Sequence, residues 1–233
     1  MHATDHAEAN LFGKRHPGPA PAEPHYLQDV IDQLNTPWPD NHIVNIVCHG
    51  HSVPAGYFRT PAVHTFESYP HLLHLSLKSR FPCALINVIV TAVGGEDSER
   101  GAARFDRDVL PFQPNVVTID YALNDRESGL KRAEIAWRSM IETGIAAGAK
   151  IILLTPSPDL DANPGDTSDP RQLHAAQVRA LACQYGIGLA DSDAVFQTYC
   201  RNGGKLEDLM SQANHPNHVG HQLIARELLD WFC

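Results

Sequence analysis

Four residues far apart in the sequence could carry out acyl-transfer chemistry together. Ser52 lies in "CHGHSVPAG" (48–56), where glycines flank a hydroxyl directly after an apolar run. A serine hydroxyl can attack a carbonyl carbon when a neighbouring base accepts its proton, and His215 is a candidate for that base. Gly95 could offer a backbone N–H, and Asn124 a side-chain N–H, to the oxyanion that such an attack creates.

The elements that must position these residues alternate between strands and helices. Apolar runs predict five strands, at 42–48, 84–93, 115–123, 149–156 and 187–192. Helical spacing and helix-ending glycines predict helices at 25–35, 66–81, 98–110, 127–148, 171–186 and from about Pro216 to Phe232. This alternation predicts right-handed crossovers and a parallel sheet with helices on both faces.

The order of the elements places the four residues at one edge of the sheet. In open parallel sheets, ligands bind beyond the carboxyl ends of the strands. Ser52, Gly95 and Asn124 follow the first, second and third predicted strands. His215 stands just before the last helix, and Pro216 suits the first turn of that helix. We therefore expect the four to converge on one rim.

Length and composition favour a single compact unit. The chain has 233 residues, of which 43% are hydrophobic, and domains of up to about 250 residues are ordinary. Residues 1–23 are polar, rich in proline and alanine and without periodicity, so we interpret them as an irregular N-terminal arm. Residues 24–233 show no repeat and no change in composition, which predicts one domain.

Charge and cysteine usage restrict the partners and the compartment. A formal net charge of −9 argues against a nucleic-acid partner, which would require a basic patch. No run approaches the roughly 18 apolar residues that cross a bilayer, and the N-terminal stretch lacks the apolar core of a signal peptide. The five cysteines include no CxxC pair. We expect a cytoplasmic protein with reduced thiols and no membrane partner; its oligomeric state stays open.

The four stretches resemble conserved blocks of the SGNH hydrolases, the GDSL-type esterases and lipases. "GHS" with Val53 and Gly56 resembles the first block, Gly-Asp-Ser-(Leu/Ile)-x-x-Gly, and "GGEDSERGAARF" resembles the second. "YALND" resembles Gly-x-Asn-Asp of the third block, and "HPNHVGHQLIA" resembles the fifth. The resemblance covers residues 43–232. It implies a flavodoxin-like three-layer α/β/α sandwich with a five-stranded parallel sheet.

The resemblance also implies a role for each residue. Ser52 would be the nucleophile and His215 the base, while the N–H groups of Ser52 and Gly95 and the side chain of Asn124 would form the oxyanion hole. Such enzymes hydrolyse carboxylic esters through an acyl-enzyme without a cofactor. The family acts on lipid esters, aryl esters and acetylated sugars, and some members transfer the acyl group. A polar, acidic loop near the rim favours a short acyl group on a polar or carbohydrate alcohol.

The sequence departs from the family pattern at three positions. His51 replaces the aspartate before the nucleophile, and Ala122 replaces the glycine of the third block. The triad acid of the family lies three residues before the histidine, where this chain has Gln212. The Gln212 amide or a backbone carbonyl near it could orient His215 instead, and Asp208 is a further candidate acid.

Two other hypotheses compete with the esterase. His215, His218 and His221 recur every three residues, but no carboxylate or thiolate accompanies them, so we predict no metal. A binding protein on an esterase scaffold, for an acylated or sugar ligand, would explain the absent acid. The four intact site residues favour an enzyme, either a hydrolase or an acyltransferase.

Overall fold

A five-stranded parallel sheet forms the centre of the protein. The computed structural model describes residues 25–161 and 168–233, so the predicted arm at 1–23 lies outside the described residues. The sheet order is β2-β1-β3-β4-β5, with every neighbouring pair parallel. The strands are β1 (Ile43–Gly50), β2 (Leu85–Val90), β3 (Val116–Asp120), β4 (Lys150–Leu154) and β5 (Gly188–Ala190). This is the flavodoxin-like order, and it confirms the predicted fold class.

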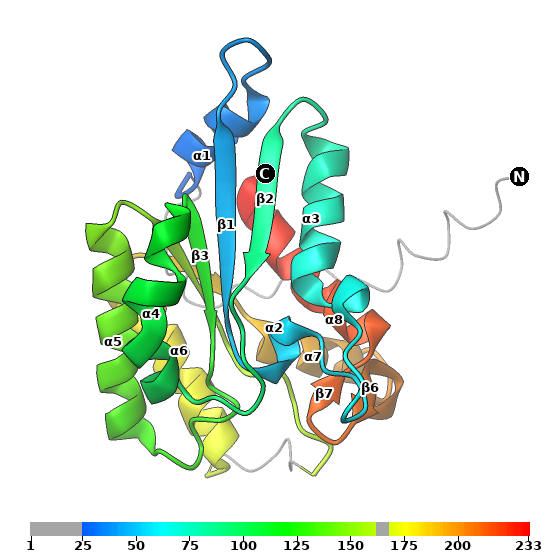
Figure 1. The fold of residues 1–233 in the computed structure, drawn as a ribbon. Coiled ribbons are helices and arrows are strands. Elements are labelled where there is room, and N and C mark those ends of the chain that lie inside the picture. The colour runs from blue at the N-terminus through cyan, green and yellow to red at the C-terminus, as the bar shows by residue number, and fades with distance from the viewer. Residues whose placement is uncertain (1–24, 162–167) are drawn as a thin grey trace, which may run out of the picture.

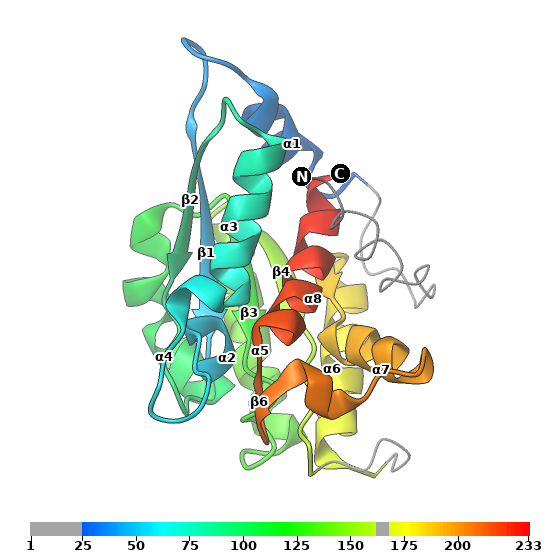
Figure 2. The same cartoon turned by 90° about the vertical axis from the view of Figure 1, so that its right-hand side faces the viewer.

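Helices cover both faces of the sheet and make three layers (Figures 1 and 2). One face carries α1 (Gln28–Asn35), α3 (Tyr69–Arg80), α7 (Ser192–Arg201) and α8 (His218–Leu229). The other carries α4 (Ser98–Asp108), α5 (Leu130–Ala146) and α6 (Pro170–Tyr185). Short 3-10 turns lie at Thr65–Glu67, Leu110–Phe112, Leu206–Leu209 and Asp230–Phe232. Alternate strand residues enter the two cores, as the two-residue period of a strand requires.

Aspartates fix the starts of three helices. Asp97, Asp169 and Asp191 each accept a hydrogen bond from a backbone N–H in the first turn of α4, α6 and α7, respectively. Helix α7 was not among the predicted helices. Its signals were the capping Asp191 and the buried Phe196, which packs into the core on the α8 side of the sheet.

The carboxyl ends of β2, β1 and β3 are joined to one another by backbone hydrogen bonds. The N–H of Val93 donates to the Gly50 carbonyl at 3.0 Å, and the N–H of His51 donates to the Asp120 carbonyl at 3.2 Å. A Cβ at Gly50 would lie 2.5 Å from the Asp120 carbonyl oxygen, so only glycine fits there. The short helix α2 (Ser52–Ala55) begins directly beyond this junction.

The segment before the last helix corrects one sequence prediction. Pro216 does not lie in the first helical turn, because His215–Pro216 forms a short strand, β7, antiparallel to β6 (Met210–Gln212). Helix α8 begins two residues later, where the Asn217 side chain accepts from the N–H groups of Val219 and Gly220. His215 is thus held by a strand pair.

None of the described helices combines the length and apolar character needed to cross a membrane. All five cysteines are free thiols, and Cys48 is buried in β1.

Candidate active site

Ser52 and His215 meet at the carboxyl edge of the sheet. Ser52 begins α2 just beyond β1, and His215 lies in β7, 163 residues later. Ser52 Oγ and His215 Nε2 are 3.0 Å apart, a distance typical of a hydrogen bond. Both residues are almost completely buried, with 7% and 5% of their surfaces exposed. The serine therefore has a base within reach of its proton.

A backbone carbonyl orients the histidine. His215 Nδ1 lies 3.2 Å from the carbonyl oxygen of Phe58, which can only accept. Nδ1 must therefore carry the ring proton, and the lone pair of Nε2 faces Ser52. This is the tautomer that general-base catalysis requires.

The two side chains that the sequence offered for this role are engaged elsewhere. Gln212 Oε1 accepts from the N–H of Thr60 at 2.9 Å, and its Nε2 lies 3.2 Å from Asn214 Oδ1. Asp208 is exposed, and its Oδ2 accepts from the Lys205 N–H at 3.2 Å. The structure thus places the Gln212 side chain against Thr60 and Asn214, and not against His215. A carbonyl does orient His215, but it comes from the loop after α2 and not from the chain near 212.

Substitutions at these two positions should therefore have little effect. We expect Gln212→Ala and Asp208→Asn each to leave kcat within about twofold of the wild type, because neither side chain contacts His215. Steady-state hydrolysis of a nitrophenyl ester measures this directly. A loss of tenfold or more in Asp208→Asn alone would mean that this carboxylate supports the base.

The loop after β3 holds Asn124 against the loop after β2. Asn124 Nδ2 donates to the backbone carbonyl of Glu96 at 2.8 Å, which leaves its second N–H available. The neighbouring Asp125 accepts from the N–H of Ser98 and from Trp137 Nε1, both at 2.7 Å. These contacts fix the two predicted oxyanion loops relative to each other.

Gly95 lies in this second loop with a backbone that favours glycine. Its φ is +77°, a left-handed conformation that other residues rarely adopt. Gly95 is exposed, and no atom lies within 4 Å of where a Cβ would be. Its backbone is thus accessible from the rim.

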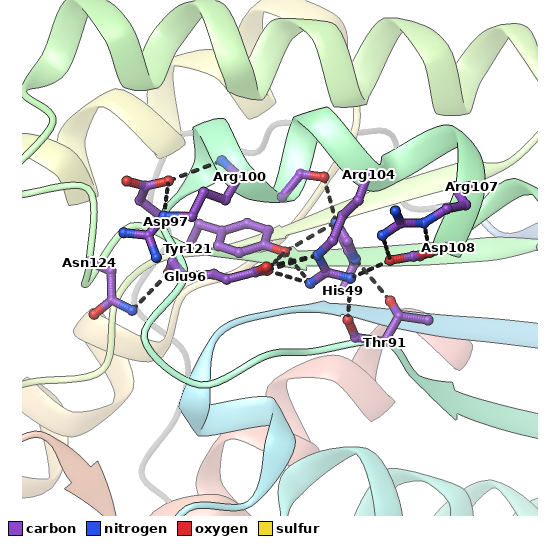
Figure 3. Close-up of polar contacts among 11 residues, drawn as sticks. His49, Thr91, Glu96, Asp97, Arg100, Arg104, Arg107, Asp108, Tyr121 and Asn124 are labelled. Carbon is purple, nitrogen blue, oxygen red and sulfur yellow. Dashed lines mark hydrogen bonds and ion pairs between the residues drawn. The ribbon is translucent and has the colours of Figure 1, made fainter.

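A buried arginine anchors the Glu96 side chain (Figure 3). Arg104 donates from Nε and from one terminal nitrogen to the Glu96 carboxylate. It also donates to the Thr91 carbonyl at 2.7 Å and to the Tyr121 hydroxyl at 3.1 Å. Because the Glu96 carbonyl holds Asn124, Arg104 supports the position of that amide indirectly.

Tyr57 connects this loop with the base. A Cβ at Gly94 would lie 2.8 Å from the Tyr57 ring, so the ring rests directly against the glycine. The centre of the same ring is 5.9 Å from that of His215. Gly94, next to Gly95, is therefore on the same side of the molecule as the Ser52–His215 pair.

Burial determines the protonation of His215. Desolvation lowers its pKa below 6.5, the bond to the Phe58 carbonyl opposes this shift, and the nearby His51 adds to it. The neutral form, which could accept a proton, therefore persists to more acidic pH than in a free histidine.

The pH dependence of the rate should show this shift. As pH falls through the lowered pKa, His215 gains a proton and can no longer accept one from Ser52. We expect the acid limb of kcat/KM to have its midpoint below pH 6.5, the ordinary value for histidine. A midpoint above 6.5 would contradict a base that is desolvated and supported only by a neutral carbonyl.

The histidines after His215 do not assemble a metal site. His218 is exposed, whereas His221 is buried and accepts the Tyr69 N–H at Nδ1. Desolvation lowers the pKa of His221 to about 3, which keeps it neutral. Within residues 25–161 and 168–233, no group of three or more His, Cys, Asp or Glu side chains could hold an ion.

A parallel α/β/α sandwich with a Ser–His pair beyond its first strand is the arrangement of a serine hydrolase. The sequence pattern of the GDSL-like lipase/acylhydrolase family matches residues 48–223. The chain belongs to that family. No similar sequence was found among curated proteins.

Solved structures share the fold. A two-domain esterase (CEX) active on acetylated mannans matches 91% of this chain with a TM-score of 0.73 and 19% identity. The match covers 53% of that esterase, so the chain spans about half its length. A catalytic mutant of Axe2, an acetylxylan esterase from Geobacillus stearothermophilus, matches 81% of this chain and 94% of its own, with a TM-score of 0.69 and 21% identity.

Proposed function

We propose that this protein is an esterase that works through a Ser52 acyl-enzyme with His215 as the base. The observation that carries the proposal is the 3.0 Å contact between Ser52 Oγ and His215 Nε2, with Nδ1 fixed by the Phe58 carbonyl. Nucleophile, base and orienting group are the three parts that activate a serine.

The reaction runs in two stages. Ser52 Oγ forms a bond to the ester carbonyl carbon while its proton moves to His215 Nε2. The tetrahedral intermediate collapses, His215 protonates the departing alcohol, and the acyl group stays on Ser52. Water then gives a proton to His215 and attacks the acyl-enzyme. As the acid is released, His215 returns that proton to Ser52 Oγ and restores the serine. No cofactor takes part in these steps.

The oxyanion would be held by the N–H groups of Ser52 and Gly95 and by Asn124 Nδ2. The proposal is supported by the joined carboxyl ends of β2, β1 and β3 and by the bond between Asn124 and the Glu96 carbonyl. Each such donor contributes roughly 3–4 kcal/mol to the transition state.

We infer an acetyl-like group on a carbohydrate alcohol as the substrate. Two proteins of similar fold are esterases of acetylated mannans and of acetylxylan. The polar loop after β4 agrees with a polar alcohol: Asp159 there accepts from Arg126 at 3.2 Å.

A substrate panel tests the proposal. Nitrophenyl esters from acetate to octanoate would be compared at equal concentration, beside acetylated xylan and mannan oligosaccharides, with acid release as the readout. We expect the acetate ester to be the best of the series and acetylated sugars to be turned over. A preference for octanoate would overturn the acetyl assignment but not the esterase.

An acyltransferase is the second candidate, because the same acyl-enzyme can react with an alcohol other than water. Adding sugars or glycerol as acceptors to the nitrophenyl acetate assay distinguishes the two. The binding-protein hypothesis depended on the missing acid, and the Phe58 carbonyl removes that support because it orients His215 without an acid.

A further inference from the structure

The hydroxyl of Ser52 contacts two imidazoles. On one side is His215; on the other, His51 Nδ1 lies 3.3 Å from Ser52 Oγ. His51 is buried, with 1% of its surface exposed. A serine with a single proton thus lies between two ring nitrogens.

The partners of His51 fix its tautomer. The N–H of Val53, which can only donate, points to His51 Nδ1 at 3.3 Å. Nδ1 must therefore carry a lone pair, and the ring proton is on Nε2. Nε2 lies 3.4 Å from Oδ1 of Asp120, the last residue of β3.

Asp120 gives His51 a support that His215 lacks. The aspartate is 3% exposed, and its other oxygen accepts from the Tyr69 hydroxyl at 3.3 Å. A buried carboxylate behind an imidazole stabilises the imidazolium that forms when the ring takes a proton. Among the described residues, the hydrogen-bond partner of His215 Nδ1 is a neutral carbonyl.

We propose that His51 is a second general base for Ser52 and that Asp120 is its positioning residue. The proposal rests on the proposed function, since it concerns the same nucleophile. The Oγ–H bond breaks and its proton passes to His51 Nδ1, while the oxygen electron pair forms the bond to the acyl carbon. The proton on Nε2 stays on His51, facing the Asp120 carboxylate, and Nδ1, once protonated, no longer accepts the Val53 N–H.

The second base accounts for a departure of this chain from the family pattern. The family has an aspartate at the position of His51, directly before the nucleophile. Such an aspartate could cap α2, but it could not provide an imidazole base with a carboxylate behind it. Here a histidine takes that place and still accepts the Val53 N–H, and the carboxylate stands one strand away at Asp120. Protonation of a poor leaving group remains the task of His215.

A pre-steady-state burst experiment isolates the second base. Nitrophenolate leaves without a proton, so acylation by nitrophenyl acetate needs a base but no general acid. We expect His215→Ala to keep a slowed burst, at least about tenfold faster than the background of Ser52→Ala. Adding Asp120→Asn or His51→Asn to His215→Ala should slow that burst at least about tenfold further, the lower end of general-base contributions. Asp208→Asn added to His215→Ala is the matched control and should change nothing.

The same variants separate catalysis from a structural role. Asn at position 51 still offers an oxygen to cap the Val53 N–H, so α2 keeps its first turn. If His51 is a base, its replacement should slow acylation mainly in the His215→Ala background. If it has only a structural role, its replacement should slow acylation equally in the wild-type and His215→Ala backgrounds. Equal slowing in both backgrounds, or a burst in His215→Ala no faster than in Ser52→Ala, would overturn the proposal. Absence of any Ser52-dependent release of nitrophenolate by the wild type, in the burst or in the steady state, would instead refute the esterase itself.

Discussion

Replacing Ser52 with alanine should abolish ester hydrolysis while leaving the fold intact. The substitution removes the atom that attacks the carbonyl, and the neighbouring imidazoles do not form the acyl intermediate in its place. We expect kcat for nitrophenyl acetate to fall by at least about 10⁴-fold. Thermal unfolding should be almost unchanged, because the substitution removes a single oxygen atom from a small side chain and leaves the backbone of α2 as it is.

The control for this variant is a serine in α3. Ser76 in α3 donates to the Leu72 carbonyl within its own helix, and Ser76→Ala should retain full activity. A serine-directed phosphonate should label Ser52 alone, as mass spectrometry of the digested protein would show. Turnover by Ser52→Ala at more than a few per cent of the wild-type rate would remove Ser52 from the mechanism.

Replacing Asn124 with alanine should produce the second large loss. Its free N–H would serve the oxyanion only in the transition state, so we expect kcat to fall by about 10²–10³-fold with KM little changed. Asn87→Ala is the matched control, since Asn87 is exposed in β2 and its side chain donates to the Asn45 side chain. A raised KM with unchanged kcat would assign Asn124 to substrate binding instead.

The anchor behind Asn124 makes this prediction more specific. Arg104 holds the Glu96 side chain, and the Glu96 carbonyl holds Asn124. Arg104→Gln should therefore lower kcat through misplacement of the amide, and this loss should largely disappear in an Asn124→Ala background. Additive losses in the double variant would show that Arg104 stabilises the fold without acting through Asn124.

The sheet could be predicted from the sequence because its strands are nearly continuous apolar runs. Strands covered on both faces, such as β3 and β4, consist almost entirely of buried residues, so their sequences clearly predict strands. The short pair β6–β7 could not be found in this way. The pair has five residues in all, and the turn between its strands has no characteristic residue pattern.

The same distinction applies to the site. Four site residues belong to short motifs that follow one another in a recognisable order, so they could be predicted together from the sequence: Ser52, Gly95, Asn124 and His215. The Phe58 carbonyl could not be proposed, because every residue has one and Phe58 is 157 positions from His215. The Asp120–His51 contact was equally hidden, since it depends on the register between β1 and β3.

The main-chain support of His215 changes which mutations would threaten the enzyme. A carbonyl is present whatever side chain occupies position 58, so no point substitution deletes it, whereas a single codon change removes an aspartate. The carbonyl is held in place by the shape of its loop, in which the Phe58 N–H donates to Ala62 and the His64 N–H donates to Gly56. Insertions and deletions between residues 57 and 64 should thus be the damaging changes during evolution. A survey that requires an acidic residue three positions before the histidine would pass over such chains as inactive.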